Sequence, residues 1–265
     1  EFRVGANLRQ DTPNSEGTIF SDTSGVVITN SEFGVYAGAK KRFFEDKVIA
    51  TATLRADKNQ NFPLMFSPAL SLVWSPNLKD YARLSFSSAL RNPTLADQYL
   101  FLDVGPATLV GNLYGVQNLV TVPSLFSYLT QDLGVGNIGL DRSYLQYFDI
   151  DKIRPEQVKT IEAGYRTTIG DKLYIDAGYY FSIYTDFIGY NIGLEISFID
   201  TFPTSPIQNL EVFRYAANSI NQVQTQGASI GLQYYMNDHI SLTGNYSWNK
   251  LVKTNEDDPI IPAFN

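Results

Sequence analysis

The sequence predicts an all-β fold, an antiparallel transmembrane β-barrel of which this chain forms an incomplete arc of about nine strands. Three observations support this prediction. Apolar and polar residues alternate in segment after segment, several of these segments are long, and the connections between them alternate between short and long. Strand side chains point alternately to opposite faces, so such segments separate two different media. Soluble strands run about 5 to 6 residues, whereas a tilted strand that crosses a bilayer needs roughly 9 to 11.

The first five predicted strands precede a long interruption. Their apolar lines, which we expect to face outward, are Phe2–Leu8, Phe33–Ala39, Val48–Ala56, Leu64–Trp74 and Ala82–Phe86. Polar residues such as Arg3 and Arg55 occupy the alternate positions. A charged side chain facing lipid costs about 2 to 4 kcal/mol near the midplane, so the restriction of these charges to the polar line supports the assignment of faces.

The last four predicted strands follow that interruption. Their apolar lines are Ile161–Thr167, Leu173–Phe187, Ala228–Met236 and Ile240–Trp248. The longest apolar line, Leu173–Phe187, is predicted to lie on one continuous strand between the tight turn IGDK and the loop at about 189–221. The inward residues Asp176 and Asp186 of this strand would lie about 33 Å apart at the rise of a strand, so they cannot act together on one bond.

The connections differ in length. Four are tight, with the sequences FFEDK, SPNLKD, IGDK and MNDH. Three are long and are expected to be extracellular loops, at about 11–31, 91–155 and 189–221, of which the second has no sustained alternation. Outer-membrane barrels have this asymmetry, with short periplasmic turns and long extracellular loops. The link KNQNF is a short exception on the outer side.

The strand number has its own consequence. With tight turns on the periplasmic side, the first and ninth strands both run outward. Bacterial single-chain barrels have an even number of strands, and an open sheet edge cannot face lipid. We therefore expect residues 1–265 to be one partial barrel domain of a larger barrel, with segments missing at both ends.

The composition excludes several classes of function. The net charge of -7 argues against a nucleic-acid partner, because no basic stripe offsets the repulsion of phosphates. There is no cysteine, and no run of about 18 apolar residues that would form a transmembrane helix. The mean hydropathy of -0.14 conceals any membrane signal, because the two alternating faces average out.

Two short motifs match enzyme signatures only in spacing. GASIG, Gly227–Gly231, has the spacing of a serine-hydrolase elbow, but the alternation continues straight through Ser229. GVGNIG, Gly134–Gly139, has the spacing of a dinucleotide loop without the strand and helix that such a loop needs. The single histidine, His239, lies in a tight turn. We therefore predict no enzyme activity, no cofactor and no metal site.

The segment 91–155 is the strongest candidate for ligand capture, because connections of this length are usually functional or disordered and this one is rich in aromatic residues. The candidate ligand-facing residues are Tyr99, Phe101, Tyr114, Tyr128, Tyr144 and Tyr147, with Arg83 and Asp186 on the inward line of the strands. Self-packing of the loop explains the aromatic residues equally well. The inward charged residues can be interpreted as a ligand path or as a cross-strand ladder of charges that keeps a wide lumen hydrated, and we prefer the ladder.

Several segments resemble a known family. They are LRADKNQNF, FSPALSLVWSPNLKDYARLSFSSALRNPTLADQYL, IRPEQVKTIEAGYR and YIDAGYYFSIYTDFI, and they are similar to the late barrel region of TonB-dependent outer-membrane receptors, particularly those of Bacteroidota. The resemblance implies a 22-stranded barrel in the outer membrane of a Gram-negative bacterium, closed by an amino-terminal plug. This sequence departs from the family in having no plug, no TonB box and no terminal strand ending in an aromatic residue.

The leading hypothesis is therefore a receptor that actively imports a scarce nutrient, such as a siderophore, glycan, peptide or cofactor. The resemblance implies three partners: outer-membrane lipid, the TonB complex acting through a plug, and a surface lipoprotein as a further candidate. Three alternatives stay open. They are a passive porin-like channel, a structural barrel partner in an outer-membrane assembly, and a soluble β-sandwich in which the apolar lines form a core.

Overall fold

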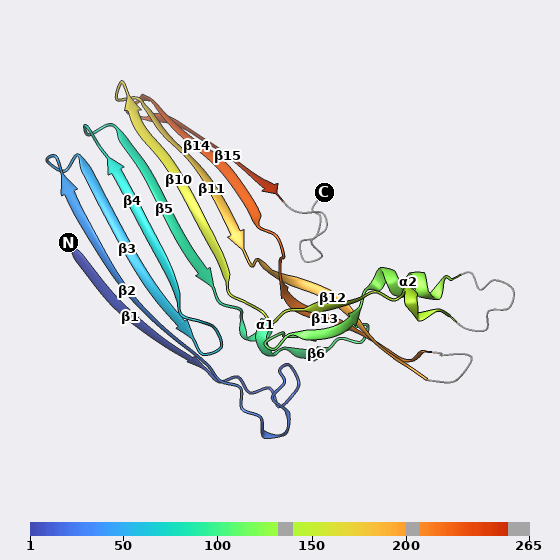
Figure 1. Ribbon diagram of the computed structural model, residues 1–265. Coiled ribbons are helices and arrows are strands. Elements are labelled where there is room, and N and C mark those ends of the chain that lie inside the picture. Colours follow the sequence, from blue (N-terminus) through green and yellow to red (C-terminus); the bar gives the residue numbers. More distant parts are fainter. Residues whose placement is uncertain (132–139, 200–206, 254–265) are drawn as a thin grey trace.

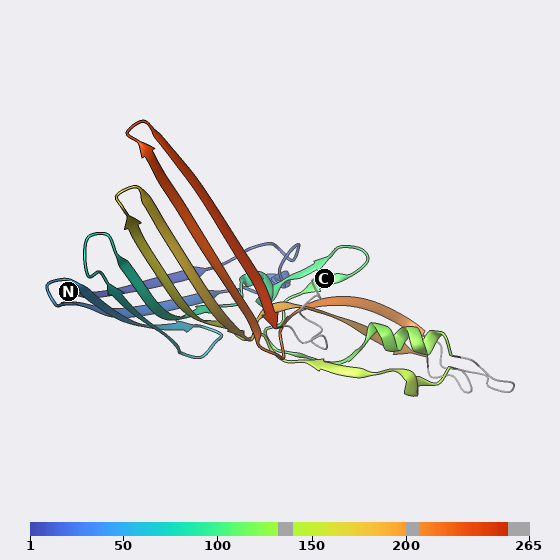
Figure 2. The ribbon, with the colours of Figure 1, turned by 90° about the horizontal axis from the view of Figure 1, so that it is seen from above.

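The computed structural model describes residues 1–131, 140–199 and 207–253 (Figure 1). These residues form two sheets. The barrel sheet has nine strands in the order β1-β2-β3-β4-β5-β10-β11-β14-β15, and the second sheet has six in the order β6-β7-β13-β12-β8-β9. GVGNIG lies outside the described residues. Figure 2 shows that the second sheet extends from one end of the barrel strands instead of stacking on either of their faces.

All nine predicted strands are confirmed. They are β1 (Phe2–Asp11), β2 (Asn30–Phe43), β3 (Val48–Asn59), β4 (Met65–Trp74), β5 (Tyr81–Arg91), β10 (Glu156–Ile169), β11 (Leu173–Thr185), β14 (Val223–Asn237) and β15 (Ile240–Lys253). Each has 10 to 15 residues, which is enough to cross a bilayer when tilted. Every neighbouring pair is antiparallel, so the sheet is the open arc of a partial barrel.

The predicted faces are also present. The strand register places Phe2, Ala39, Ala52, Leu70 and Phe86 in one cross-strand row on the outward face. Outward apolar side chains are solvent-accessible, with Phe2 87% and Leu70 55% exposed. No described segment covers this face as a second layer would in a soluble sandwich. Its apolar surface therefore suits lipid.

All four predicted tight turns join consecutive barrel strands, at 44–47, 75–80, 170–172 and 238–239. In the turn before β5, the Asp80 carboxylate accepts hydrogen bonds of 2.7 Å from the Thr167 hydroxyl, the Asn77 amide and the Tyr165 hydroxyl. These donors lower the pKa of Asp80, because they stabilise the ionised carboxylate. The turn is thereby tied to β10.

The long connections contain helices and strands that the sequence pattern did not reveal. Their elements are η1 (Thr23–Gly25), α1 (Leu95–Tyr99), β6 (Phe101–Asp103), β7 (Thr108–Val110), β8 (Val116–Val120), α2 (Val122–Leu129), η2 (Arg142–Tyr144), β9 (Tyr147–Ile150), β12 (Ile188–Phe198) and β13 (Ile207–Asn218). Four of the strands have only 3 to 5 residues, too few for an alternation to be recognised. Their partners β12 and β13 come from a different connection, so the second sheet exists only in the tertiary structure.

The prediction of one continuous strand over Leu173–Phe187 is wrong at its last two residues. β11 ends at Thr185, and Ile188 begins β12 in the other sheet. Between them Asp186 has φ 53°, in the left-handed region that breaks an extended strand. The alternation continues across the break because β12 is itself a strand with its own two faces.

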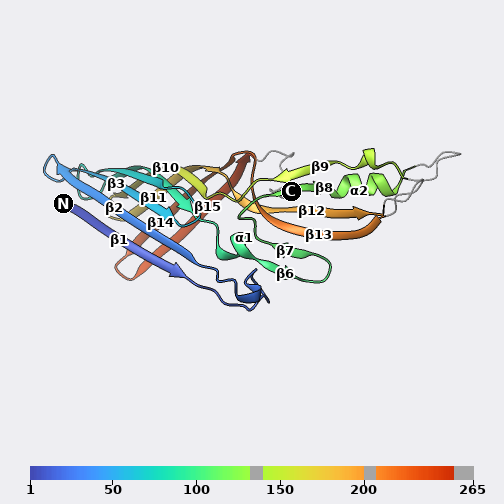
Figure 3. The same ribbon diagram turned by 60° about the horizontal axis from the view of Figure 1, so that its bottom comes forward.

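Most of the hydrophobic core lies in the second sheet. One cluster joins Leu119, Ile150 and Phe213, and another joins Leu125 and Tyr128 of α2 to Leu194 of β12. Figure 3 shows α2 at the end of the second sheet that is distant from the barrel strands. No helix among the described residues has the length and hydrophobicity needed to span a bilayer.

Candidate functional site

A polar groove lies on the inward face of the barrel sheet, at the end nearest the second sheet. Its volume is about 790 Å³, and its lining comes from β1 to β5 and the segment that leads into α1. The charged residues in this lining are Arg9, Asp11, Glu32, Arg55, Asp57 and Arg91. The groove therefore combines both signs of charge on the wall of the lumen.

Arg55 is the centre of the charge network in this groove. Its Nε donates to Asp57 Oδ2 at 2.7 Å, and its Nη2 donates to Asn7 Oδ1 at 2.8 Å. Gly34 lies beside the guanidinium, and a Cβ there would come within 2.5 Å of Arg55 Nη2. A nearby second pair joins Arg9 to Asp11 at 2.9 Å. Each of these ion pairs lies within a single strand, between residues two apart, so the charges of the groove neutralise one another without forming a cross-strand ladder there.

The edge of the groove is bonded to the second sheet through Glu156. This carboxylate is nearly buried, accepts from Arg91 Nη2 at 3.1 Å, and accepts from the backbone N–H of Ile188 at 3.0 Å. It therefore joins β5, β10 and the first residue of β12. The Arg91 guanidinium and the Ile188 N–H together compensate the buried negative charge of Glu156. These hydrogen bonds therefore fix the position of β12 relative to β5 and β10.

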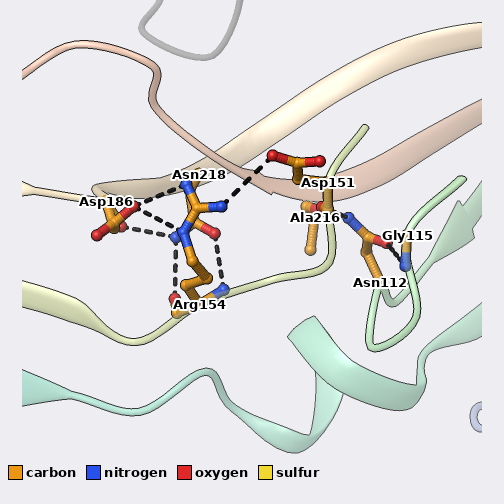
Figure 4. A network of polar contacts seen from close by, with 7 residues as sticks. All are labelled: Asn112, Gly115, Asp151, Arg154, Asp186, Ala216 and Asn218. Carbon is orange, nitrogen blue, oxygen red and sulfur yellow. Dashed lines mark hydrogen bonds and ion pairs between the residues drawn. The ribbon is translucent and has the colours of Figure 1, made fainter. Parts of the chain in front are cut away.

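The junction network is a set of polar contacts around Arg154 and Asn218 (Figure 4). The Arg154 backbone N–H donates to Asn218 Oδ1 at 2.7 Å, and Asn218 Nδ2 donates to the Arg154 carbonyl at 2.9 Å. The Arg154 guanidinium reaches Asp186 Oδ1 at 2.8 Å and Asp151 Oδ2 at 3.5 Å. The strand break at Asp186 is therefore held by Arg154 from the connection between β5 and β10, and by Asn218 of β13, whose Nδ2 donates to the Asp186 carbonyl at 2.7 Å.

Asn112 completes the junction network from the connection between β7 and β8. Its Nδ2 donates to the carbonyl oxygens of Asp151 at 2.7 Å and Ala216 at 3.0 Å, and its Oδ1 accepts from the Gly115 N–H at 3.0 Å. The residue is 2% exposed. One buried amide thus connects three chain segments that are distant in sequence.

The predicted aromatic residues do not converge on one cavity. Tyr128 is 1% exposed and packs edge-on against Phe198, so it belongs to the core of the second sheet and is not a ligand contact. The reason is its position: Tyr128 follows Leu125 by one helical turn, and both point from α2 onto the sheet. The prediction that Tyr128 faces a ligand is wrong.

The other five aromatic candidates are accessible or partly accessible. Tyr99 is half-buried and its hydroxyl accepts from Asn61 Nδ2 at 2.7 Å, while Phe101, Tyr114, Tyr144 and Tyr147 are each at least half exposed. Tyr144 lines a hollow of about 420 Å³ beside α2, with Ser127 and Gln146. Tyr144 and Tyr147 come from the neighbouring elements η2 and β9 and are both exposed.

The two inward charges have different surroundings. Arg83 lies on β5 at 3.7 Å from Glu162 of β10 and lines a hollow of about 250 Å³ on the lumen wall. Asp186 lies at the break between β11 and β12, where Arg154 pairs with it, instead of lining a continuous strand. Its placement on a continuous inward line is therefore corrected, and ligand contact by either residue stays a prediction.

Sequence reasoning missed the residues that position this site, namely Asn112, Arg154, Glu156 and Asn218. The segment IRPEQVKTIEAGYR contains two of them and carried part of the family resemblance, which was the only available signal. Asn112 and Asn218 carry no periodic signal, because their side-chain partners other than Gly115 lie 32 to 104 residues away. Only the folded chain reveals them.

The GASIG motif does not have the geometry of a serine-hydrolase elbow. Ser229 lies within β14, paired with Gly178 and Ser247, so no strand-to-helix elbow surrounds it. His239 lies in the turn between β14 and β15, where its N–H donates to Asn237 Oδ1 at 2.9 Å. Within residues 1–131, 140–199 and 207–253, no group of three or more His, Cys, Asp or Glu residues could hold a metal ion.

The connection between β1 and β2 supports α1 through backbone hydrogen bonds. Ser21 N–H donates to the Tyr99 carbonyl at 3.0 Å, and Phe101 N–H donates to the Ile19 carbonyl at 2.8 Å. Asp22 organises this connection, because its carboxylate accepts from the Ser15 hydroxyl at 2.6 Å and from the Gly17 N–H at 2.7 Å. The Ser15 hydroxyl and backbone donors lower the pKa of Asp22 to about 2.

The lowered pKa of Asp22 predicts how the order of this connection depends on pH. A carboxyl whose pKa is depressed by folding stabilises the fold above its unfolded pKa of about 3.9, and this stabilisation is lost as pH falls toward 2. We expect Asp22→Asn to increase amide exchange in residues 15–22 at pH 7, and to leave little pH dependence between 4 and 2. Glu16→Gln, which changes an exposed carboxyl in the same connection, is the matched control; an equal effect of both variants would contradict the assignment.

Comparisons with known proteins extend over nearly the whole chain. The family model described as TonB dependent receptor-like, beta-barrel matches residues 1–263. The siderophore receptor PirA from Acinetobacter baumannii superposes with a TM-score of 0.62 at 14% identity, over 96% of this chain and 34% of that chain. PirA from Pseudomonas aeruginosa gives 0.59 at 14% identity, over 94% and 37%.

The FrpB iron transporter from Neisseria meningitidis gives a TM-score of 0.57 at 13% identity, over 98% of this chain and 34% of that chain. The chain thus spans about a third of the length of these solved structures. At such identities the similarity is one of fold. No curated protein matches the sequence.

Proposed function

The chain belongs to the family of TonB-dependent receptor-like β-barrels, and from that premise we propose that it forms part of the barrel wall and the ligand-capturing surface of an active nutrient transporter. The family consists of receptors and transporters of the Gram-negative outer membrane, not of enzymes. A Bacteroidota origin is part of the proposal and rests on the sequence resemblance alone.

The observation that carries the proposal is the arrangement of the two sheets. Nine long strands have an apolar outward face and a polar, charge-paired inward face. A separately folded sheet extends from the end with the long connections, where the junction network holds it. We infer that this end is extracellular, that the second sheet captures the ligand, and that the polar inward face borders its path.

The proposed partners follow from the same arrangement. Lipid surrounds the outward face, and TonB acts through a plug that the inward face encloses. A surface lipoprotein would contact the second sheet. The proposed cargo is a siderophore, glycan, peptide or cofactor, and the exposed pair Tyr144 and Tyr147 is the proposed first contact, because aromatic rings offer large, rigid surfaces for all four classes.

Uptake by cells that express the full-length receptor tests this proposal. We expect one cargo from a radiolabelled panel of the four classes to accumulate, and accumulation to stop when the proton gradient is collapsed, while surface binding persists. Uptake that survives the collapse would contradict active transport and favour a passive channel, for which single-channel conductance is the second measurement.

The same assay locates the capture surface. Tyr144→Ser combined with Tyr147→Ser should weaken surface binding about tenfold, which corresponds to roughly 1.4 kcal/mol. Tyr235→Ser is the matched control, because Tyr235 is similarly exposed but lies beside the tight turn between β14 and β15. Unchanged affinity in the double variant would remove the pair from the site. The deletion of residues 92–154 is a poorer test, since it would remove four of the six strands of the second sheet.

A further inference from the structure

An apolar hollow of about 580 Å³ lies on the outward face of the barrel sheet. Its floor is formed where Ala39 of β2 pairs with Ala52 of β3, next to Ala50. Leu70, Leu72 and Phe86 rise beside these small residues from β4 and β5. Alanine next to leucine and phenylalanine leaves a depression, and its volume is within the range of about 300 to 1,000 Å³ that small-molecule sites occupy.

One cationic side chain, that of Lys41, lines this hollow. The register places Lys41 opposite Ala50, and its Nζ lies 5.0 Å from the centroid of the Phe43 ring. Lys41 is two residues from Phe43, the last residue of β2, so its Cα lies about 7 Å along the strand from that end. The side chain extends back toward the tight turn, as a lysine does when it reaches from apolar surface to a membrane interface.

The outward face as a whole carries cations without anions. In the register of the nine described strands, its charged residues are Lys41, Lys58, Lys159 and Lys250, and none of the outward positions is Asp or Glu. Lys41 has no carboxylate within ion-pair distance among the described residues. The inward face differs, because there Arg55 and Arg83 have acidic partners. An anionic ligand would supply the counter-charge that Lys41 lacks among these residues.

Among these lysines, Lys41 alone lies beside the hollow, at the end of the strands with the tight turns. Phe43, Val48 and Trp74 form the next cross-strand row toward that turn, and Trp is enriched at membrane interfaces. Negative lipid headgroups attract basic residues at this level. An acyl chain suits the alanine floor, and a phosphate suits the ammonium.

We propose that this hollow is a specific site for one anionic phospholipid, with the phosphodiester on Lys41 and an acyl chain against Ala39, Ala50 and Ala52. The lipid belongs to the leaflet that borders the tight turns. A second copy of this chain does not fit, because its outward face would bring further lysines and no carboxylate. The proposal shares with the proposed function only the embedding of the outward face in lipid, and it is independent of the cargo.

The test uses the full-length receptor, delipidated in detergent, with phosphatidylglycerol and phosphatidylcholine of identical acyl chains as probes in native mass spectrometry. We expect the unmodified receptor to retain one phosphatidylglycerol molecule and to prefer it over phosphatidylcholine. In Lys41→Gln this preference should fall about fivefold, the factor expected for one basic residue at an anionic interface. Ala52→Phe, which fills the hollow, should abolish retention of the tightly bound lipid.

Lys159→Gln is the matched control, because Lys159 lies on the same face near the opposite end of the strands. Equal retention of both lipids by the unmodified receptor, or an equal effect of Lys159→Gln and Lys41→Gln, would overturn the proposal. Cargo uptake measured on the unmodified receptor and the same variants separates the lipid-site proposal from the proposed transport function. Absence of lipid selectivity in the unmodified receptor with normal energised uptake would overturn only the lipid site, and absence of energised uptake with normal lipid selectivity would overturn only the transport function.

Discussion

Leu70→Arg should prevent stable insertion of the full-length receptor, whereas Ser71→Arg should be tolerated. Leu70 lies in the middle of β4 on the outward face and is 55% exposed, and the next residue points to the inward face. An arginine that faces lipid near the midplane costs about 2 to 4 kcal/mol. At Ser71 the same arginine would face a hydrated lumen, between the small residues Thr51 and Ser85.

Heat-modifiable gel mobility and urea unfolding of the receptor in lipid vesicles measure this difference. Adjacent positions on one strand make the pair a stringent test, because length, secondary structure and depth in the membrane are the same. Equal stability of the two variants would contradict the assignment of faces. A soluble β-sandwich predicts that Leu70→Arg abolishes folding in detergent-free buffer, where the unmodified protein would be soluble.

Asn112→Ala should loosen the second sheet without affecting the barrel sheet. The substitution leaves the carbonyl oxygens of Asp151 and Ala216 and the N–H of Gly115 without their partner. Each buried polar group that loses its hydrogen bond costs about 1 to 3 kcal/mol. Because Asn112 connects the β7–β8 connection to β13 and to the segment before β10, we expect the second sheet to open as a unit.

Hydrogen exchange of the full-length receptor measures this effect. Amides of β8, β12 and β13 should exchange at least tenfold faster in Asn112→Ala, while those of β3 and β4 stay unchanged. Asn209→Ala is the matched control, since Asn209 is exposed on β13 and its amide donates to Glu211 on the same strand. Uniform acceleration in both sheets would show instead that Asn112 supports the entire fold.

The barrel sheet was predictable because its signal is local. Each lipid-spanning strand must alternate for 10 or more residues, and the alternation in Phe2–Leu8 or Ala228–Met236 needs no knowledge of the partner strand. The tight turns were equally visible, as short polar interruptions such as SPNLKD. The same rule failed at Asp186 and Phe187, because alternation persists when a chain leaves one sheet and begins a strand in another.

The candidate site was less predictable, because it depends on contacts between distant segments. Counting aromatic residues selected Tyr128, which is a core residue of α2, together with Tyr144 and Tyr147, which are exposed. Aromatic side chains serve as core and as ligand contacts, and only burial distinguishes the two. The short strands β6 to β9 obtain their partners from β12 and β13, so their sequences alone carry little strand signal.

The sequence by itself determined the residues that face outward, the nine barrel strands and their tight turns. These features follow from the medium that each strand face contacts, lipid on one side and water on the other, because that medium determines the polarity of each residue separately. Tertiary structure alone decided that the long connections build a second sheet, that Asn112, Arg154 and Asn218 hold it, and that three alanines form a hollow beside Lys41. Such features arise from contacts between segments that are distant in sequence. The residues adjacent to a side chain in the sequence do not indicate which distant residue it will contact.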